Sequence, residues 1–171
     1  RMPVVLPQRI TPELVCLLQR FHPLWLNTQF NHPAEFTPES EAALARLANA
    51  GIPLGNQSVL LKGINDKPET MRALLHKLVK NRVRPYYLYH CDYVRGLSHF
   101  RTSIRTGLDL LKTLQGHTSG FAVPSYVIDL PEGGGKMPLH AAHLAHLNLT
   151  GGEQLDLHNF EGIRFELNID A

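Results

Sequence analysis

Hydrophobic positions along the chain follow two different periods. Apolar residues recur every three or four positions, the spacing of one helix face, in four segments: 11–21, 37–51, 65–79 and 104–114. Between and after these segments lie short apolar runs typical of buried strands, at 24–30, 53–61, 84–92 and 123–129. Strands and helices that alternate through short connections form right-handed βαβ units, so the pattern predicts an α/β fold with a parallel sheet.

Three of the four helical segments carry a start signal. Thr11 and Thr37 each precede a proline and a glutamate, the order expected of a capping hydroxyl and a first helical residue. Residues 65–69, Asn-Asp-Lys-Pro-Glu, open the third helix. Residues 3–7, ahead of the first helix, predict an extended loop.

The pattern of alternation changes beyond residue 138. Residues 155–158 and 163–167 alternate apolar and polar positions on either side of a short Asn-Phe-Glu-Gly segment, which predicts a β-hairpin. We therefore expect two parts, an α/β part at residues 1–138 and a C-terminal hairpin extension at residues 139–171.

Polar side chains stand where the predicted strands end. They occupy four stretches: 27–35, 56–58, 90–92 and 129–136. In barrels of alternating strands and helices the chemistry takes place at the carboxyl ends of the strands, so these stretches are expected to converge on one face.

The last of these stretches, residues 129–136, reads Asp-Leu-Pro-Glu-Gly-Gly-Gly-Lys. Gly133, Gly134 and Gly135 allow close approaches that a Cβ would prevent. Backbone amides can therefore contact a planar or anionic group while the Lys136 amine reaches it, an arrangement that suits Schiff-base chemistry. The alternative is a flexible surface loop with a solvated lysine, because short motifs often match by chance.

Composition narrows the class of protein. The chain has 171 residues, 43% of them hydrophobic and 19% charged, enough for one domain with a core. Its net charge is only +2 and its basic residues are scattered, which argues against a nucleic-acid partner. No apolar run approaches the ~18 residues of a membrane span. Cys16 and Cys91 lack the spacing of a metal site or a disulfide framework, and the chain opens on Arg1 without a signal region, so we expect a cytoplasmic protein and a piece of a longer one.

The candidate site residues also have ordinary structural interpretations. Asp92 can act as a capping or turn residue and Asp129 as a strand-end turn residue. Gln57 can satisfy backbone groups inside the sheet. Three histidines at three-residue steps lack carboxylate or cysteine partners, which favours packing or solvent exposure over metal binding: His140, His143 and His146.

Several motifs together resemble the C-terminal half of the lysine 2,3-aminomutase family. The similarity runs without a break from about residue 1 to residue 138 and continues at 159–162. The motifs that carry it lie at residues 4–10, 31–33, 55–63, 84–87, 96–102, 116–120 and 133–136.

The resemblance implies a C-terminal part of a partial TIM-type (β/α) barrel from a radical S-adenosylmethionine enzyme. Such an enzyme uses a [4Fe-4S] cluster and pyridoxal phosphate to move the amino group of L-lysine from the α to the β carbon. Lys136 takes the place of the lysine that bonds to pyridoxal phosphate, beside the run Gly133, Gly134 and Gly135. Gln57, with Asn56, takes the place of the contact to S-adenosylmethionine.

By the same resemblance, Asp92 and Asp129 take the places of the carboxylates that hold the substrate's ε-ammonium. Two carboxylates in a closed site repel each other unless a cation lies between them, so the pair favours a dibasic substrate. Gln29 stands where these enzymes commonly carry histidine.

Two departures from the family pattern bear on activity and assembly. The cluster motif Cys-x3-Cys-x2-Cys is absent, so this chain alone is expected to be inactive, with the cluster ligands upstream. Lys67 replaces a cysteine that binds zinc at subunit contacts in some members, so the homo-oligomer expected of the full-length protein would not be zinc-linked.

Two other functions remain open. One is a related aminomutase that supplies β-lysine for modification of a translation elongation factor, whose relatives lack the glycine run before the lysine. The other is a non-catalytic half barrel that binds pyridoxal phosphate or a partner.

Overall fold

The computed structural model describes residues 2–140, 154–159 and 161–168. Its α-helices are α1 (Met2–Val5), α2 (Pro12–Gln19), α3 (Pro38–Asn49), α4 (Pro68–Lys80) and α5 (Ile104–Leu114). Its strands are β1 (Leu26–Thr28), β2 (Leu54–Val59), β3 (Val83–Tyr89), β4 (Ser125–Leu130), β5 (Gly135–Pro138), β6 (Gln154–His158) and β7 (Arg164–Asn168). Short 3-10 turns lie at η1 (Pro7–Arg9), η2 (Pro33–Glu35), η3 (Ser98–Phe100), η4 (Gly120–Ala122) and η5 (Pro131–Gly133).

The main sheet has five strands in the order β1-β2-β3-β4-β5. Strands β1 to β4 run parallel, which confirms the parallel sheet predicted from the alternating pattern. Strand β5 is antiparallel to β4 and was not predicted. The predicted C-terminal hairpin is confirmed, because β6 and β7 pair as a separate antiparallel sheet.

Helices α2, α3 and α4 begin where the sequence signals predict, and two of the three have a side-chain cap. The hydroxyl oxygens of Thr11 and Thr37 accept hydrogen bonds from Leu14 N and Ser40 N, so both threonines cap their helices as expected. The third helix begins at Pro68, inside the predicted opening stretch 65–69, but its N-cap residue Lys67 makes no side-chain capping bond. The Asn65 side chain bonds to the backbone of the β2–α4 connection.

The first residues also differ from expectation. Residues 3–7, predicted to be extended, lie instead in the helical turn α1 and the start of η1. A proline at the first turn of a helix loses no hydrogen bond, and so Pro3 and Pro7 are compatible with helical turns.

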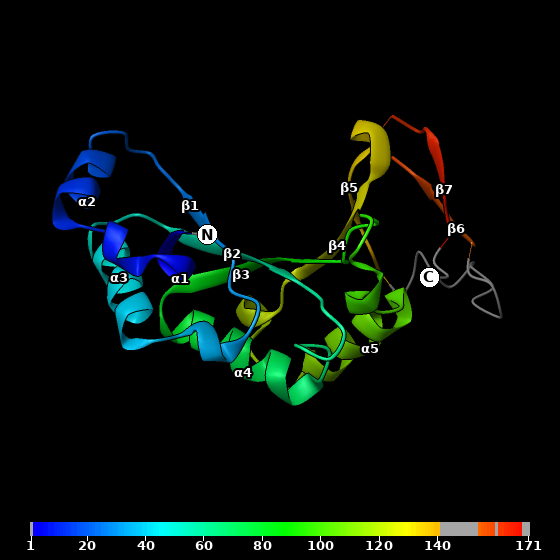
Figure 1. The fold of residues 1–171 in the computed structure, drawn as a ribbon, viewed down its shortest axis with the longest axis horizontal. Coiled ribbons are helices and arrows are strands. Elements are labelled where there is room, and N and C mark those ends of the chain that lie inside the picture. The colour runs from blue at the N-terminus through cyan, green and yellow to red at the C-terminus, as the bar shows by residue number, and fades with distance from the viewer. Residues whose placement is uncertain (1, 141–153, 160, 169–171) are drawn as a thin grey trace.

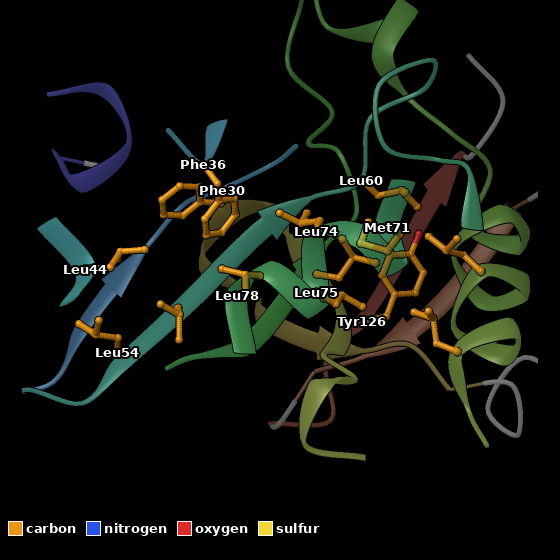
Figure 2. Close-up of a cluster of buried hydrophobic side chains, with 14 of the residues drawn as sticks. Phe30, Phe36, Leu44, Leu54, Leu60, Met71, Leu74, Leu75, Leu78 and Tyr126 are labelled. Carbon is orange, nitrogen blue, oxygen red and sulfur yellow. The ribbon is translucent and has the colours of Figure 1, made fainter. Parts of the chain in front are cut away.

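Helices α3, α4 and α5 lie along one face of the sheet (Figure 1). The core fills the space between these helices and the sheet, where the side chains shown in Figure 2 pack together. Leu44, Leu74 and Leu78 from the helices are fully buried there beside Phe30 and Tyr126 from the strand side. Alternate strand residues point to opposite faces, so the residues between these core positions face the other side of the sheet.

The hairpin of β6 and β7 lies beside β5, at the opposite end of the sheet from α2 (Figure 1). Phe165 of β7 packs against the core cluster, which joins the hairpin to the main sheet. No helix in the described ranges is both long enough and apolar enough to cross a membrane.

Candidate functional site

The β4–β5 hairpin places Asp129 directly opposite Lys136. The two residues are cross-strand partners, and Lys136 Nζ lies 3.3 Å from Asp129 Oδ1. The Asp129 carboxylate, followed by the nearby Tyr89, raises the pKa of Lys136 above its ordinary value. The same ammonium stands 5.8 Å from the centre of the Tyr89 ring. Lys136 therefore lies on a strand, within reach of one of the predicted carboxylates.

The glycines before Lys136 build the turn of this hairpin. Gly133 and Gly135 have φ angles of +79° and +88°, a region that side chains rarely enter. A Cβ added at Gly134 would lie 2.5 Å from Cζ of Phe165, so this glycine lets β7 approach the turn. The predicted contact of these three glycines with a ligand stays a prediction.

An open cavity of about 170 Å³ lies on the sheet face away from the core. Its lining brings together three predicted site residues with three others: Gln57, Asp92 and Asp129, and Gln29, Val59 and Tyr89. Closed ligand pockets commonly enclose roughly 300–1,000 Å³, so this cavity has room for one end of a ligand.

The Asp92 carboxylate has a raised pKa at the edge of this cavity. Surrounding protein displaces water from one side of it, and the Asp129 carboxylate adds repulsion, while the Lys136 ammonium acts in the opposite direction. The two carboxylates therefore influence each other electrostatically, and a cation between them would relieve the repulsion.

Asn56 has a different position from Gln57. Its side chain is 1% exposed and makes four hydrogen bonds within the protein: from Thr28 Oγ1 and Phe30 N, and to Phe30 O and Ser58 Oγ. These bonds hold the end of β1 against β2. The side chain of Gln57 lines the cavity on the opposite face, as alternation along a strand requires.

Three tyrosines of β3 form an aromatic group beside this cavity, which the sequence pattern does not indicate. A bulge opposite Asn56 and Gln57 skips Tyr86 in the register, which lets Tyr86 stack on Tyr87 at 3.9 Å between ring centres. Tyr89 meets Tyr87 edge-on at 5.6 Å. A hydrogen bond between the Tyr86 and Tyr87 hydroxyls, together with burial, raises the pKa of Tyr87 to about 12. The sequence does not reveal this bulge, and regular alternation would place Tyr86 and Tyr87 on opposite faces of the sheet.

His90 lies behind the cavity, in the layer that packs on α5. It is 1% exposed, and its Nδ1 is 2.8 Å from the hydroxyl oxygen of Tyr126. Burial, and then repulsion by the Arg101 guanidinium, lower the pKa of His90 to about 4. His90 is therefore neutral at physiological pH.

We expect the stability of the protein to fall in mild acid because of His90. An unfolded histidine titrates near 6.5, so between that pH and about 4 the unfolded state binds a proton that the folded state does not. This contribution is complete above the unfolded pKa and is lost as pH falls toward the folded one. The free energy of unfolding should be about 2 kcal/mol lower near pH ~5 than near pH ~7.5.

Urea unfolding at the two pH values measures this difference. A His90→Gln variant keeps a polar partner for Tyr126 but cannot titrate, so its pH dependence should be smaller by about the same ~2 kcal/mol. An equal pH dependence in the variant and the natural protein would show that other groups cause it.

The histidines and cysteines considered in the sequence have the following places in the structure. In the part of the chain that is described, no three His, Cys, Asp or Glu side chains gather as a possible metal site. His140 is exposed, while His143 and His146 lie outside the described residues. Cys16 is exposed and Cys91 buried, and both are free thiols.

Known proteins provide a separate line of evidence. A sequence model of the family described as lysine-2,3-aminomutase matches residues 111–166. The chain is 56% identical over 163 residues to L-lysine 2,3-aminomutase of Methanococcus maripaludis, covering 95% of this chain and 37% of that protein. It is 55% identical to L-lysine 2,3-aminomutase of Clostridium subterminale over 95% of this chain and 38% of that protein.

A relative with another substrate in its name is also similar. Glutamate 2,3-aminomutase of Clostridioides difficile is 47% identical over 93% of this chain and 37% of that protein. The chain thus spans little more than a third of the length of the curated relatives it matches. These matches confirm the resemblance identified from the sequence motifs.

Proposed function

Because the chain belongs to the lysine 2,3-aminomutase family, whose C-terminal part it matches, we propose that it forms the substrate-binding part of an enzyme that converts L-lysine to β-lysine. The observation that carries the proposal is the placing of Asp92 and Asp129 on one cavity with Lys136 paired to Asp129. A site of this charge suits a ligand with an amino group at its far end.

Lys136 is the residue proposed to hold pyridoxal phosphate. Its side chain is 46% exposed, so the amine is accessible to a cofactor, and the Tyr89 ring beside it offers an aromatic surface. When bound, pyridoxal phosphate supplies an aldehyde that condenses with amines and a conjugated ring that delocalises an unpaired electron. Condensation needs the neutral amine, so Nζ must lose its proton and leave the ion pair with Asp129 Oδ1, which holds the ammonium form, before it reacts.

The two carboxylates are proposed to select a dibasic substrate. Burial, and then repulsion by the Asp129 carboxylate, raise the pKa of Asp92, so a substrate ammonium between the two carboxylates gains attraction from both. Glutamate, the substrate in the name of the Clostridioides difficile relative, has a distal carboxylate and would add a third negative charge beside Asp92 and Asp129. The charge of the site therefore favours lysine over glutamate.

Gln57 is proposed to contact S-adenosylmethionine, with Asn56 holding β1 and β2 in place behind it. S-adenosylmethionine and a [4Fe-4S] cluster would supply the radical that starts the reaction. Two cysteines cannot supply the three thiolates of the cluster motif, so we propose that its ligands come from elsewhere in the full-length protein.

The architecture proposed for the complete enzyme follows from the sheet. Four parallel strands with helices on one face are the elements that part of a (β/α) barrel would contain, and they support the proposal that the cavity faces the inside of such a barrel. We propose residues 1–138 as the barrel part and residues 139–171 as its hairpin extension. The full-length enzyme is further proposed to be a homo-oligomer.

The preference of the enzyme for L-lysine over L-glutamate tests this function. The natural full-length protein, made anaerobically with cluster, S-adenosylmethionine, pyridoxal phosphate and a reductant, should form β-lysine from L-lysine and much less product from L-glutamate. Asp92→Asn and Asp129→Asn should each lower kcat/KM for lysine by roughly 10- to 100-fold, the cost of losing one partner of a charged hydrogen bond.

Asp109→Asn is the matched control, because this exposed carboxylate on α5 pairs with Arg105 away from the cavity. Its kcat/KM should equal that of the natural protein. A full-length protein without product from either amino acid would show that the sheet serves as a binding module, and unchanged rates in both aspartate variants would show that the ammonium binds elsewhere.

A further inference from the structure

Asp92 lies in a segment that has little regular structure to hold it. Between the end of β3 and the start of α5, residues 92–99 are exposed, and η3 is their one regular turn. A carboxylate at the start of such a loop has many positions available, and each one removed costs conformational entropy. A substrate contact at Asp92 therefore needs a second element that restricts the loop.

Arg101, at the far end of this loop, reaches back to its first residues. One guanidinium nitrogen, Nη2, donates a hydrogen bond of 3.4 Å to the carbonyl oxygen of Asp92. The centre of the guanidinium lies 4.2 Å from the ring centre of Tyr93, within the range of a cation–π contact. Arg101 thus contacts the two residues that begin the loop.

The surroundings of Arg101 are unusual for a cation. Arg101 is only 9% exposed, and its Nε is buried without a hydrogen-bond partner. None of the ion pairs within the described ranges includes it. Burying a charge without a carboxylate partner costs several kcal/mol of folding free energy, so stability alone does not account for an arginine at this position.

Backbone hydrogen bonds hold both ends of the loop, the first to β4 and the second to the β2–α4 connection. At the first end, His90 N donates to Val127 O at 2.7 Å and the His90 ring bonds to Tyr126. At the second end, Lys62 N donates to Phe100 O at 2.8 Å. Because Arg101 follows Phe100 directly, its backbone is held in place. Its side chain can therefore restrict the position of Asp92 through the hydrogen bond to the Asp92 carbonyl oxygen.

From these contacts we propose that Arg101 is a positioning residue, which holds the loop so that the Asp92 carboxylate faces Asp129 across the cavity. This inference rests on the proposed function, in which Asp92 binds a distal ammonium. Arg101 would act on that ammonium only through Asp92, since its contacts are to the backbone and to Tyr93.

Ligand binding by the natural full-length protein, loaded with pyridoxal phosphate and kept without reductant, tests the inference. Titration calorimetry compares L-lysine with L-norleucine, which has the same carbon chain and α-amino group but lacks the ε-ammonium. Arg101→Lys keeps the charge but loses the planar fork that reaches both Asp92 and Tyr93. We expect this variant to bind lysine about tenfold more weakly and norleucine as tightly as before.

Two further variants separate a positioning role from a merely structural one. In an Asp92→Asn background, Arg101→Lys should have no further effect on lysine binding, because the two residues act in series. Arg95→Gln changes an exposed arginine of the same loop and should leave both affinities unchanged. Thermal unfolding of each variant is measured alongside.

The outcomes are distinguishable. Equal weakening of lysine and norleucine, an undiminished effect in the Asp92→Asn background, or unchanged lysine binding in Arg101→Lys overturns the inference and leaves the proposed function standing. If Asp92→Asn itself leaves the preference for lysine over norleucine unchanged, the proposed role of Asp92 fails, and this inference fails with it.

Discussion

Replacing Lys136 with alanine should remove the covalent attachment of pyridoxal phosphate and lower β-lysine formation by on the order of a thousandfold or more. This amine is the nucleophile proposed to hold the cofactor, and losses of that size are typical when such a group is removed. The variant should fold normally, because the Lys136 side chain is 46% exposed and its ion pair with Asp129 lies at the surface.

Borohydride reduction followed by peptide mass mapping measures the attachment directly, independently of turnover. The natural full-length protein should carry the reduced cofactor on Lys136, and Lys136→Ala should carry none. Lys112→Ala, an exposed lysine of α5, is the matched control and should keep both the attachment and the activity. Cofactor found on another lysine of the natural protein would contradict the assignment.

Replacing Gly107 with alanine should lower the free energy of unfolding by about 2–4 kcal/mol. A Cβ at this position of α5 would lie 2.5 Å from both Cε1 and the hydroxyl oxygen of Tyr126, so the fully buried ring must move. Overpacking of this kind costs roughly 1–3 kcal/mol, and the buried His90–Tyr126 hydrogen bond would be lost or distorted for about 1–3 kcal/mol more. The better helix propensity of alanine returns only about 1 kcal/mol.

Urea unfolding monitored by circular dichroism gives this value. Gly120→Ala is the control, since an added Cβ there meets no atom within 4 Å and the residue has no positive φ. Equal stabilities of the two variants would show that α5 can shift away from β4 without cost.

Most of the sheet and its helices could be predicted because their signals are local. The segment 104–114 was predicted to be a helix from its apolar period alone, and it matches α5 at both ends. The structure adds the cap, Ser103, whose hydroxyl oxygen accepts a hydrogen bond from Thr106 N. Strand β5 was missed because its own residues, 135–138, include a glycine and a proline and show no alternation of apolar and polar types. Its pairing depends on β4, a tertiary effect that no short window of sequence contains.

The candidate site was predictable only in part for the same reason. The order of strand ends was enough to place Gln57, Asp92 and Asp129 on one cavity, because parallel strands bring their carboxyl ends together. Arg101 gave no signal, since it precedes a helix and its partner Asp92 is nine residues away along an irregular loop.

The pairing of Asp129 with Lys136 also limits how this segment can change in evolution. Their contact depends on hairpin register, so insertion of a single residue into the turn would send the lysine side chain to the face packed on the helices. Substitutions within the turn need only preserve its backbone angles. In descendants of this sequence the number of residues separating the carboxylate from the amine should therefore vary less than the identity of those residues.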